Sequence, residues 1–283
     1  MKPNRFAVLS AVAQVERLGA SAAVLSKALR LLRNPNSTAT ALVEVIQADP
    51  AMTADIISLG NSAYYGVTSR ISTLTDAVNL LGYDEVYRMI GFNASKQVFA
   101  QPLIAYGLTA EEDWSLSVAC ALLMQDLAPL LDLPVDESYT TGLLHRVGCR
   151  AIDHALREVR LVGTFQTSPL STIERENAFV GMSYCDVGGM LLERWRFPDH
   201  VVEAVRLQRC VIRPSEPPLL TALRLSVATL GGAEFGTNAA RDEARQSLSG
   251  TLAAMGKSWA DLEALRAGSE EKLATLRRSL GFR

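Results

Sequence analysis

The run from Asp49 to Gly66 constrains the fold most, because one short segment carries the start, the buried stripe and the stop of a helix. Asp49 can accept a hydrogen bond from a free first-turn N–H, and Pro50 fits the first helical position. Gly66 tolerates a left-handed backbone and can end the element. Between these ends, apolar side chains recur at helical intervals, at Met52, Ile56, Leu59 and Ala63. We expect a rigid helical corner here, without catalytic chemistry of its own.

Four side chains near the end of this run can tie its last turn to a neighbouring segment. Asn61 and Ser62 supply an amide and a hydroxyl group, whereas Tyr64 and Tyr65 combine apolar rings with polar tips. We interpret the tyrosine pair as packing in the core or between lobes. A partner-binding surface is the alternative.

Apolar residues recur three and four positions apart through the rest of the chain, which predicts an all-α fold. Helices are expected over residues 6–18 and 22–33. Ser37 or Thr38 can cap a third helix, which closes at the corner.

The segment after the corner carries clear helix boundaries. Thr73 and Asp76 form the pattern of a capping box for a helix that ends at Gly82. Asp84 is expected to cap the helix that follows.

Residues 101–109 contain a proline and a glycine and are expected to form a joint. The acidic residues 111–113 then favour a helix start, where the helix dipole attracts negative charge. The helices expected beyond this point cover residues 114–131 and 138–155, begin at Thr172 and at Ser183 or Asp186, and cover 201–210 and 219–230, with Gly231-Gly232 as the last stop.

Composition excludes several classes of protein. The chain has 283 residues and a net charge of −2, which argues against a strongly basic nucleic-acid surface. The four cysteines are widely spaced along the chain, and we interpret them as reduced thiols. The most apolar run, 118–131, is interrupted by Gln125, Asp126 and Pro129, and no targeting segment is visible. We expect a cytoplasmic protein that binds neither nucleic acid nor membrane.

The order Asp-Pro, Asn-Ser-Ala, Tyr-Gly, Ile-Ser and Leu-Gly in residues 49–82 resembles the signature of the HDOD family, a bacterial, all-helical relative of the HD metal-dependent phosphohydrolases. The resemblance implies a two-lobed helical domain over residues 20–232, with an N-terminal lobe at 20–105 and an HD-like lobe at 110–232. Residues 1–19 would form an N-terminal helix. Residues 233–283 would form a helical extension that packs back on the body or, alternatively, serves a homodimer or a partner.

The same resemblance places an eroded metal site in the second lobe. HD hydrolases carry an adjacent His-Asp pair, and His145 is here followed by Arg146, a cation that opposes a divalent metal. By the same resemblance, Tyr184 stands where relatives often carry histidine, and Gln208 and Arg209 stand at the expected place of a histidine pair. The chain has three histidines in all. We expect no metal ligands, no cofactor and no catalytic residues.

Two functions remain open at this point. The resemblance implies a non-catalytic regulator or scaffold of bacterial signal transduction that contacts other signalling proteins. The alternative is a metal-free receptor for a nucleotide second messenger such as a cyclic dinucleotide, in which Arg146 and Arg209 would bind phosphate because guanidinium groups pair with phosphate oxygens. Structural arginines are the simpler interpretation of both residues. A residual phosphohydrolase is the least favoured function.

Overall fold

The computed structural model describes residues 20–32, 38–47, 50–62, 65–158, 171–211, 216–231 and 235–279, together with Ser10, Val12 and Asn34. Every regular element in these ranges is helical, and the one β-bridge among them pairs Leu103 with Leu108. The predicted all-α, two-lobed class is confirmed. Most of the helix expected over 6–18 lies outside the described residues.

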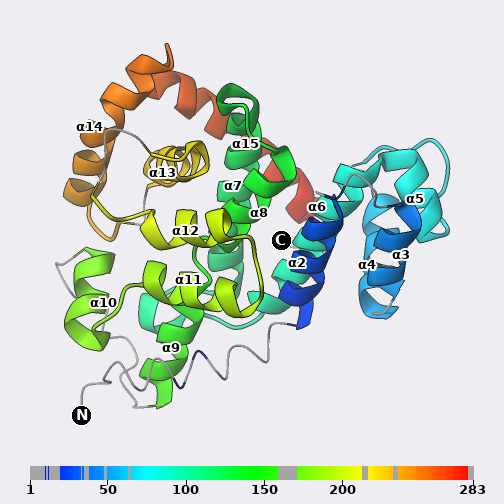
Figure 1. Cartoon of the computed structure of the whole chain (residues 1–283), viewed down its shortest axis with the longest axis horizontal. Coiled ribbons are helices and arrows are strands. Elements are labelled where there is room, and N and C mark those ends of the chain that lie inside the picture. Colours follow the sequence, from blue (N-terminus) through cyan, green and yellow to red (C-terminus); the bar gives the residue numbers. More distant parts are fainter. Residues whose placement is uncertain are drawn as a thin grey trace.

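The N-terminal lobe packs five helices around a shared apolar core (Figure 1). Its long central helix, α6, contacts α2 and α4, and the side chains that the sequence pattern turns inward on α6 are fully buried, at Val86, Met89 and Ile90. The helices of this lobe are α2 (Ala20–Leu32), α3 (Ala39–Gln47), α4 (Pro50–Gly60), α5 (Leu74–Leu81) and α6 (Tyr83–Val98).

The corner helix is shorter than predicted, because α4 ends at Gly60 and not at Gly66. The amide of Asn61 stops it: Nδ2 donates to the carbonyls of Ile57 and Ile71, each at 2.8 Å, and Oδ1 accepts from the Ile71 N–H at 2.9 Å. This clamp turns the chain back toward α5, as expected for a residue that ties the last turn to a neighbour. Gly66 has the expected left-handed backbone, with φ of 55°.

The other motif residues around the corner have simpler roles. The Ser62 N–H donates to the Leu59 carbonyl at 2.9 Å, and the Ser62 carbonyl accepts from the Tyr65 N–H at 3.2 Å. Tyr65 is half-buried and packs on the core, in a small cleft whose walls come from both lobes. Asp49 and Tyr64 lie outside the described residues, whereas Pro50 opens α4.

The boundary between α5 and α6 confirms one prediction and corrects another. Thr73 and Asp76 form the predicted capping box, with Thr73 Oγ1 accepting from the Asp76 N–H at 3.0 Å. Gly82 ends α5 with φ of 87°. However, Asp84 is not a cap: α6 begins at Tyr83, so Asp84 lies inside the first turn, where its charge faces the helix dipole.

The second lobe is organised around α7 (Ala110–Leu127), which a short 3-10 turn, η3 (Ala128–Leu131), continues. Thr109 and Glu112 cap α7 reciprocally, after the predicted joint and its own short turn, η2 (Ile104–Tyr106). The remaining helices of this lobe are α8 (Val135–Leu144), α9 (Gly148–Glu158), α10 (Thr172–Val180), α11 (Tyr184–Arg194), α12 (Asp199–Leu207) and α13 (Pro218–Leu230).

The single helix expected over 138–155 is in fact two, because the chain turns at residues 145–147. Close backbone contacts flank the turn. A Cβ on Gly142 would lie 2.7 Å from the Cα of Ala121, so α8 is pressed against α7. A Cβ on Gly148 would lie 2.0 Å from the Tyr184 carbonyl oxygen, so α9 starts directly on α11. The two close contacts hold the end of α8 and the start of α9 on different neighbours, one on each side of the turn.

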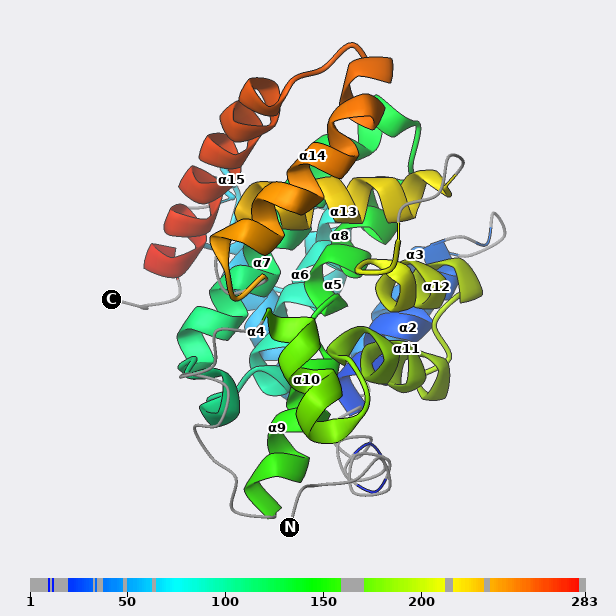
Figure 2. The same ribbon diagram turned by 90° about the vertical axis from the view of Figure 1, so that its left-hand side faces the viewer.

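The C-terminal extension lies on the second lobe as two helices, α14 (Asn238–Ala254) and α15 (Trp259–Ser279), which cover α13 and α7 (Figure 2). Lys272 of α15 pairs with Asp126 of α7 at 2.6 Å, and Arg277 pairs with Glu111. The structure thus places this segment against the body, and a role in dimerisation stays a prediction.

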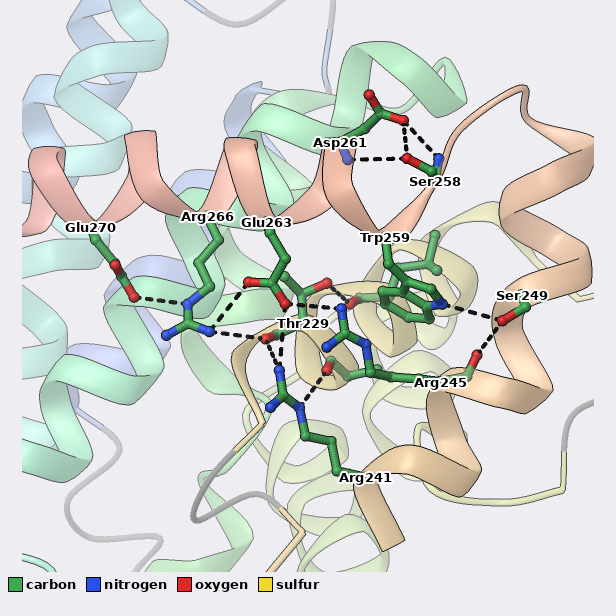
Figure 3. Close-up of polar contacts among 12 residues, drawn as sticks. Thr229, Arg241, Arg245, Ser249, Ser258, Trp259, Asp261, Glu263, Arg266 and Glu270 are labelled. Carbon is green, nitrogen blue, oxygen red and sulfur yellow. Dashed lines mark hydrogen bonds and ion pairs between the residues drawn. The ribbon is translucent and has the colours of Figure 1, made fainter. Parts of the chain in front are cut away.

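An arginine network fixes the extension to the end of α13 (Figure 3). The Glu263 carboxylate receives Arg245 at 2.9 Å, Arg266 at 3.4 Å and Arg241 at 3.5 Å. Arg241 and Arg266 also donate to the Thr229 carbonyl, at 3.1 and 3.4 Å. The two arginines therefore satisfy a carbonyl at the end of α13, where the helix dipole favours positive charge.

Among the described helices, the stretch 110–131 alone has the length and apolar composition of a membrane span. Of its most apolar window, 61% is buried inside the fold, as in the core helix of a globular domain.

Candidate functional site

The turn between α8 and α9 buries the two residues that stand at the HD position. The His145 ring nitrogen Nδ1 lies 2.6 Å from the Gly142 carbonyl oxygen, which can only accept, so Nδ1 carries the proton. His145 is fully buried and Arg146 is 1% exposed. Neither side chain faces solvent in this structure.

Arg146 belongs to a buried charge cluster that reaches across to α7. The Asp113 carboxylate accepts from Arg146 Nε at 3.2 Å through one oxygen and from an Arg150 terminal nitrogen at 2.5 Å through the other. Arg150 also donates to the Gln101 carbonyl. Burial lowers the pKa of the Arg150 guanidinium, and the charge of Asp113 offsets only part of that decrease. We call Arg146, Asp113 and Arg150 the buried arginine cluster.

A second buried carboxylate, Glu176 on α10, lies beside this cluster. Its two oxygens accept from the Tyr106 hydroxyl at 2.6 Å and from the Tyr184 N–H at 2.8 Å. Burial raises the pKa of Glu176 from 4.5 to about 7, and the hydrogen bonds from Tyr106 and Tyr184, followed by the charge of Arg146, counteract part of that rise. Tyr184 is fully buried as well, and its backbone N–H joins α11 to Glu176 on α10.

Gln208 and Arg209, the other two predicted binding residues, lie at the end of α12 and line a cavity of about 400 Å³. Gln208 Nε2 donates to the His145 and Val205 carbonyls, both at 2.9 Å, so it connects this cavity to the α8–α9 turn. The Arg209 guanidinium lies 3.7 Å from the centroid of the Phe235 ring. Arg146 is absent from the lining of this cavity.

The residues of this region do not fit a divalent-metal site. Such an ion takes several convergent oxygen or nitrogen ligands. No three His, Cys, Asp or Glu side chains within the described ranges gather closely enough to hold one. Asp113 already directs both oxygens at guanidinium groups, and His145 uses Nδ1 on a carbonyl. The donor set is therefore that of a structural salt-bridge cluster.

Sequence reasoning missed Asp113, Arg150 and Glu176. The acidic run 111–113 predicts three dipole-facing acids, but Asp113 is buried, as is its neighbour Trp114. A stronger signal was available at the start of α9. There, charged residues recur at spacings of four, three and four, at Arg146, Arg150, Asp153 and Arg157, and the first three of these are buried.

Residues 18–210 match the HDOD domain. The chain belongs to the HDOD domain family. The corner signature in residues 49–82 therefore identified the family correctly, and the corner clamp and the buried arginine cluster are both parts of an HDOD domain.

Solved structures share this fold. An HDOD domain protein with unknown function from Geobacter sulfurreducens has a TM-score of 0.68 and 21% identity, covering 90% of this chain and 89% of that chain. A candidate phosphohydrolase from Shewanella amazonensis SB2B has a TM-score of 0.68 and 22% identity, covering 97% and 98%. A candidate signal transduction protein from Marinobacter aquaeolei VT8 has a TM-score of 0.64 and 21% identity, covering 92% and 58%. Likeness at these identities establishes the HDOD fold alone.

An uncharacterized protein of Treponema pallidum (strain Nichols) is 22% identical over 209 residues, which are 71% of this chain and 40% of that protein. The chain thus spans less than half the length of this relative.

Proposed function

We propose that this chain is a non-catalytic regulator of bacterial signal transduction that acts through contacts with other signalling proteins. The observation that carries the proposal is the buried arginine cluster. A hydrolase of the HD type needs a carboxylate that is available to a metal, and here Asp113 is 1% exposed and held between two guanidinium groups. The cluster joins α7 to α9 and the joint before α7, which is a structural task.

Two further facts support the proposal. The described residues hold no metal-binding group of three or more ligands, and an HDOD relative in fold, the Marinobacter protein, is described as a candidate signal transduction protein. The Shewanella description as a candidate phosphohydrolase favours the opposite function, residual hydrolysis. The donor set around His145 weighs against that alternative in this chain.

The test has a catalytic arm and a contact arm. In the first, the purified protein is incubated with phosphomonoesters, phosphodiesters and cyclic dinucleotides in the presence of Mn²⁺, Fe²⁺ or Mg²⁺. We expect no turnover. Turnover of any of these substrates that a chelator abolishes would overturn the proposal.

In the second arm, a photo-crosslinking amino acid replaces Leu80 on the N-terminal lobe or Val211 on the second lobe, which are 50% and 88% exposed. The same amino acid at Leu143, which is fully buried, provides the background. We expect a discrete crosslink to another signalling protein in the bacterium that carries the gene. Crosslinking at both exposed positions that stays at background would contradict action through protein contacts.

A further inference from the structure

Helix α10 lies at the edge of the second lobe and docks there through a narrow face (Figure 1). Three of its nine residues are buried, Thr172, Glu176 and Val180, and their spacing of four places them on one stripe of the helix. Ile173 and Phe179 add partly buried apolar contacts. The middle of the stripe, where a docked helix usually carries an apolar side chain, is thus the fully buried carboxyl group of Glu176.

Glu176 connects α10 to two other elements. One carboxylate oxygen accepts from the Tyr106 hydroxyl of η2 at 2.6 Å, and the other accepts from the Tyr184 N–H at the start of α11 at 2.8 Å. Among the residues that the structure describes, Glu176 forms no ion pair. A buried carboxylate without an ion pair costs free energy because a charge leaves water, whereas the neutral acid avoids most of that cost. The attachment of α10 therefore favours a protonated Glu176.

The cations near Glu176 offset this preference only in part. Arg146, at the α8–α9 turn, already pairs with Asp113 in the buried arginine cluster. Arg175 lies on α10 itself, so its position relative to Glu176 depends little on docking. Burial raises the pKa of Glu176 to about 7, although its two hydrogen bonds, followed by the charges of the two arginines, act to lower it.

Neighbouring elements present hydroxyl and thiol groups to this region. Burial raises the pKa of the Tyr106 hydroxyl on η2 and of the Cys185 thiol on α11, so both keep their protons near neutral pH. Cys149 on α9 lies against Tyr106. A hydroxyl both donates and accepts, so Tyr106 can accept from the O–H of a protonated Glu176 and donate to an ionised one. Protonation therefore keeps the contact between α10 and η2 and removes the buried charge.

The sign of the pH effect follows from the docked and undocked states of α10. In the docked helix Glu176 holds its proton up to about pH 7, whereas in an undocked helix, exposed to water, it would release that proton near its ordinary pKa of 4.5. Docking is therefore strongest below about pH 4.5 and weakens as the pH rises to about 7.

We propose that Glu176 is a proton-dependent latch that holds α10 on η2 and α11, and that its ionisation favours release of α10 while the rest of the second lobe stays folded. Release breaks the hydrogen bonds of Glu176 with Tyr106 and Tyr184. It also opens the bond from the Thr172 N–H to the Phe235 carbonyl, which measures 3.2 Å at the start of the helix. Use of this release as a signal rests on the proposed function, whereas the latch itself does not.

The test is backbone hydrogen exchange of the full chain at about pH 5.5 and about pH 7.5, with rates corrected for the intrinsic pH dependence of exchange. Because the pKa of Glu176 is about 7 in the docked helix and 4.5 in water, the open fraction of α10 should increase about ten- to thirtyfold between these pH values. The amides of α10 should exchange while those of the central helix α7 are still protected, which distinguishes release of α10 from global unfolding.

Two variants of α10 assign the effect to one carboxyl group. Glu176→Gln removes the titrating group and should abolish the pH response, whereas Glu174→Gln, the same change at an exposed position of the helix, should keep it. The wild-type comparison alone can refute the latch, so the test does not depend on how well Glu176→Gln folds. The proposal is overturned if α10 and α7 exchange together, if the corrected α10 rate is the same at both pH values, or if the two variants respond to pH alike. Neither turnover nor crosslinking enters these measurements, so the two proposals fail separately.

Discussion

Replacing Asp113 with asparagine isolates the contribution of the buried arginine cluster to stability. The substitution keeps the shape of the side chain but removes the negative charge that faces Arg146 and Arg150, which are 1% and 6% exposed. Two charge-assisted hydrogen bonds are weakened, each of about 1.5–3 kcal/mol, and breaking a buried ion pair by removing one partner typically costs about 3–5 kcal/mol. We therefore expect Asp113→Asn to destabilise the protein by about 3–5 kcal/mol.

The assay is the thermal midpoint followed by circular dichroism at neutral pH. At about 2–4 °C per kcal/mol for a domain of this size, the midpoint should fall by roughly 6–20 °C. Glu111→Gln is the matched control, because Glu111 lies in the same first turn of α7 and pairs with Arg277, but these side chains are 39% and 36% exposed. An exposed pair contributes less than about 1 kcal/mol.

Adding Arg146→Met to Asp113→Asn should recover part of the loss, since one uncompensated buried cation is removed. If Asp113→Asn lowers the midpoint no more than Glu111→Gln does, the cluster does not stabilise the fold and the structural interpretation of Arg146 is wrong.

Three further predictions concern single positions. Burial raises the pKa of Glu176 from 4.5 to about 7, so the folded protein holds a proton that the unfolded chain releases, and stability should fall on the order of 3 kcal/mol as the pH rises from about 4.5 to about 7. Glu176→Gln should flatten this fall in denaturation midpoints at pH 5 and pH 8, and an unchanged slope would exclude Glu176 as its source. Gly148→Ala should prevent normal folding, because the added Cβ would meet the Tyr184 carbonyl. Gly250→Ala on α14 is the control, since its Cβ meets nothing within 4 Å and the change should stabilise the protein by about 0.5–1 kcal/mol. Equal thermal midpoints for the two variants would refute the packing argument. Thr73→Ala should cost about 1 kcal/mol of urea-unfolding free energy through loss of the α5 cap, and no change would show that the capping box is dispensable.

The features that could be predicted from the sequence depend on interactions between residues close together in the chain. The Thr73–Asp76 capping box and the buried stripe of α6 depend on residues within a few positions of each other, and both are present as expected. The predicted length of the corner helix is wrong because the end of α4 depends on hydrogen bonds between Asn61 and Ile71, which lie on either side of the following loop.

The candidate site was less accessible for the same reason. Asp113 meets Arg146 and Arg150 across 33 and 37 positions, and Glu176 meets Tyr106 across 70. Local sequence periodicity cannot predict hydrogen-bonded pairs that lie so far apart in the chain. The break between α8 and α9 was hidden because Gly142 and Gly148 act through neighbours on α7 and α11, and only the packed structure shows those contacts.

The attachment of α15 to α7 also has a consequence for synthesis. Lys272 reaches Asp126 across 146 positions, and Arg277 reaches Glu111 across 166. At a ribosomal rate of about 5–20 residues per second, α7 emerges roughly 7–30 seconds before the helix that covers it. During that interval, the face of α7 that α15 covers is exposed to solvent. Pairing of α7 with α8, the next α-helix along the chain, buries a different part of α7, so the face under α15 is the part that waits for the C-terminal helix.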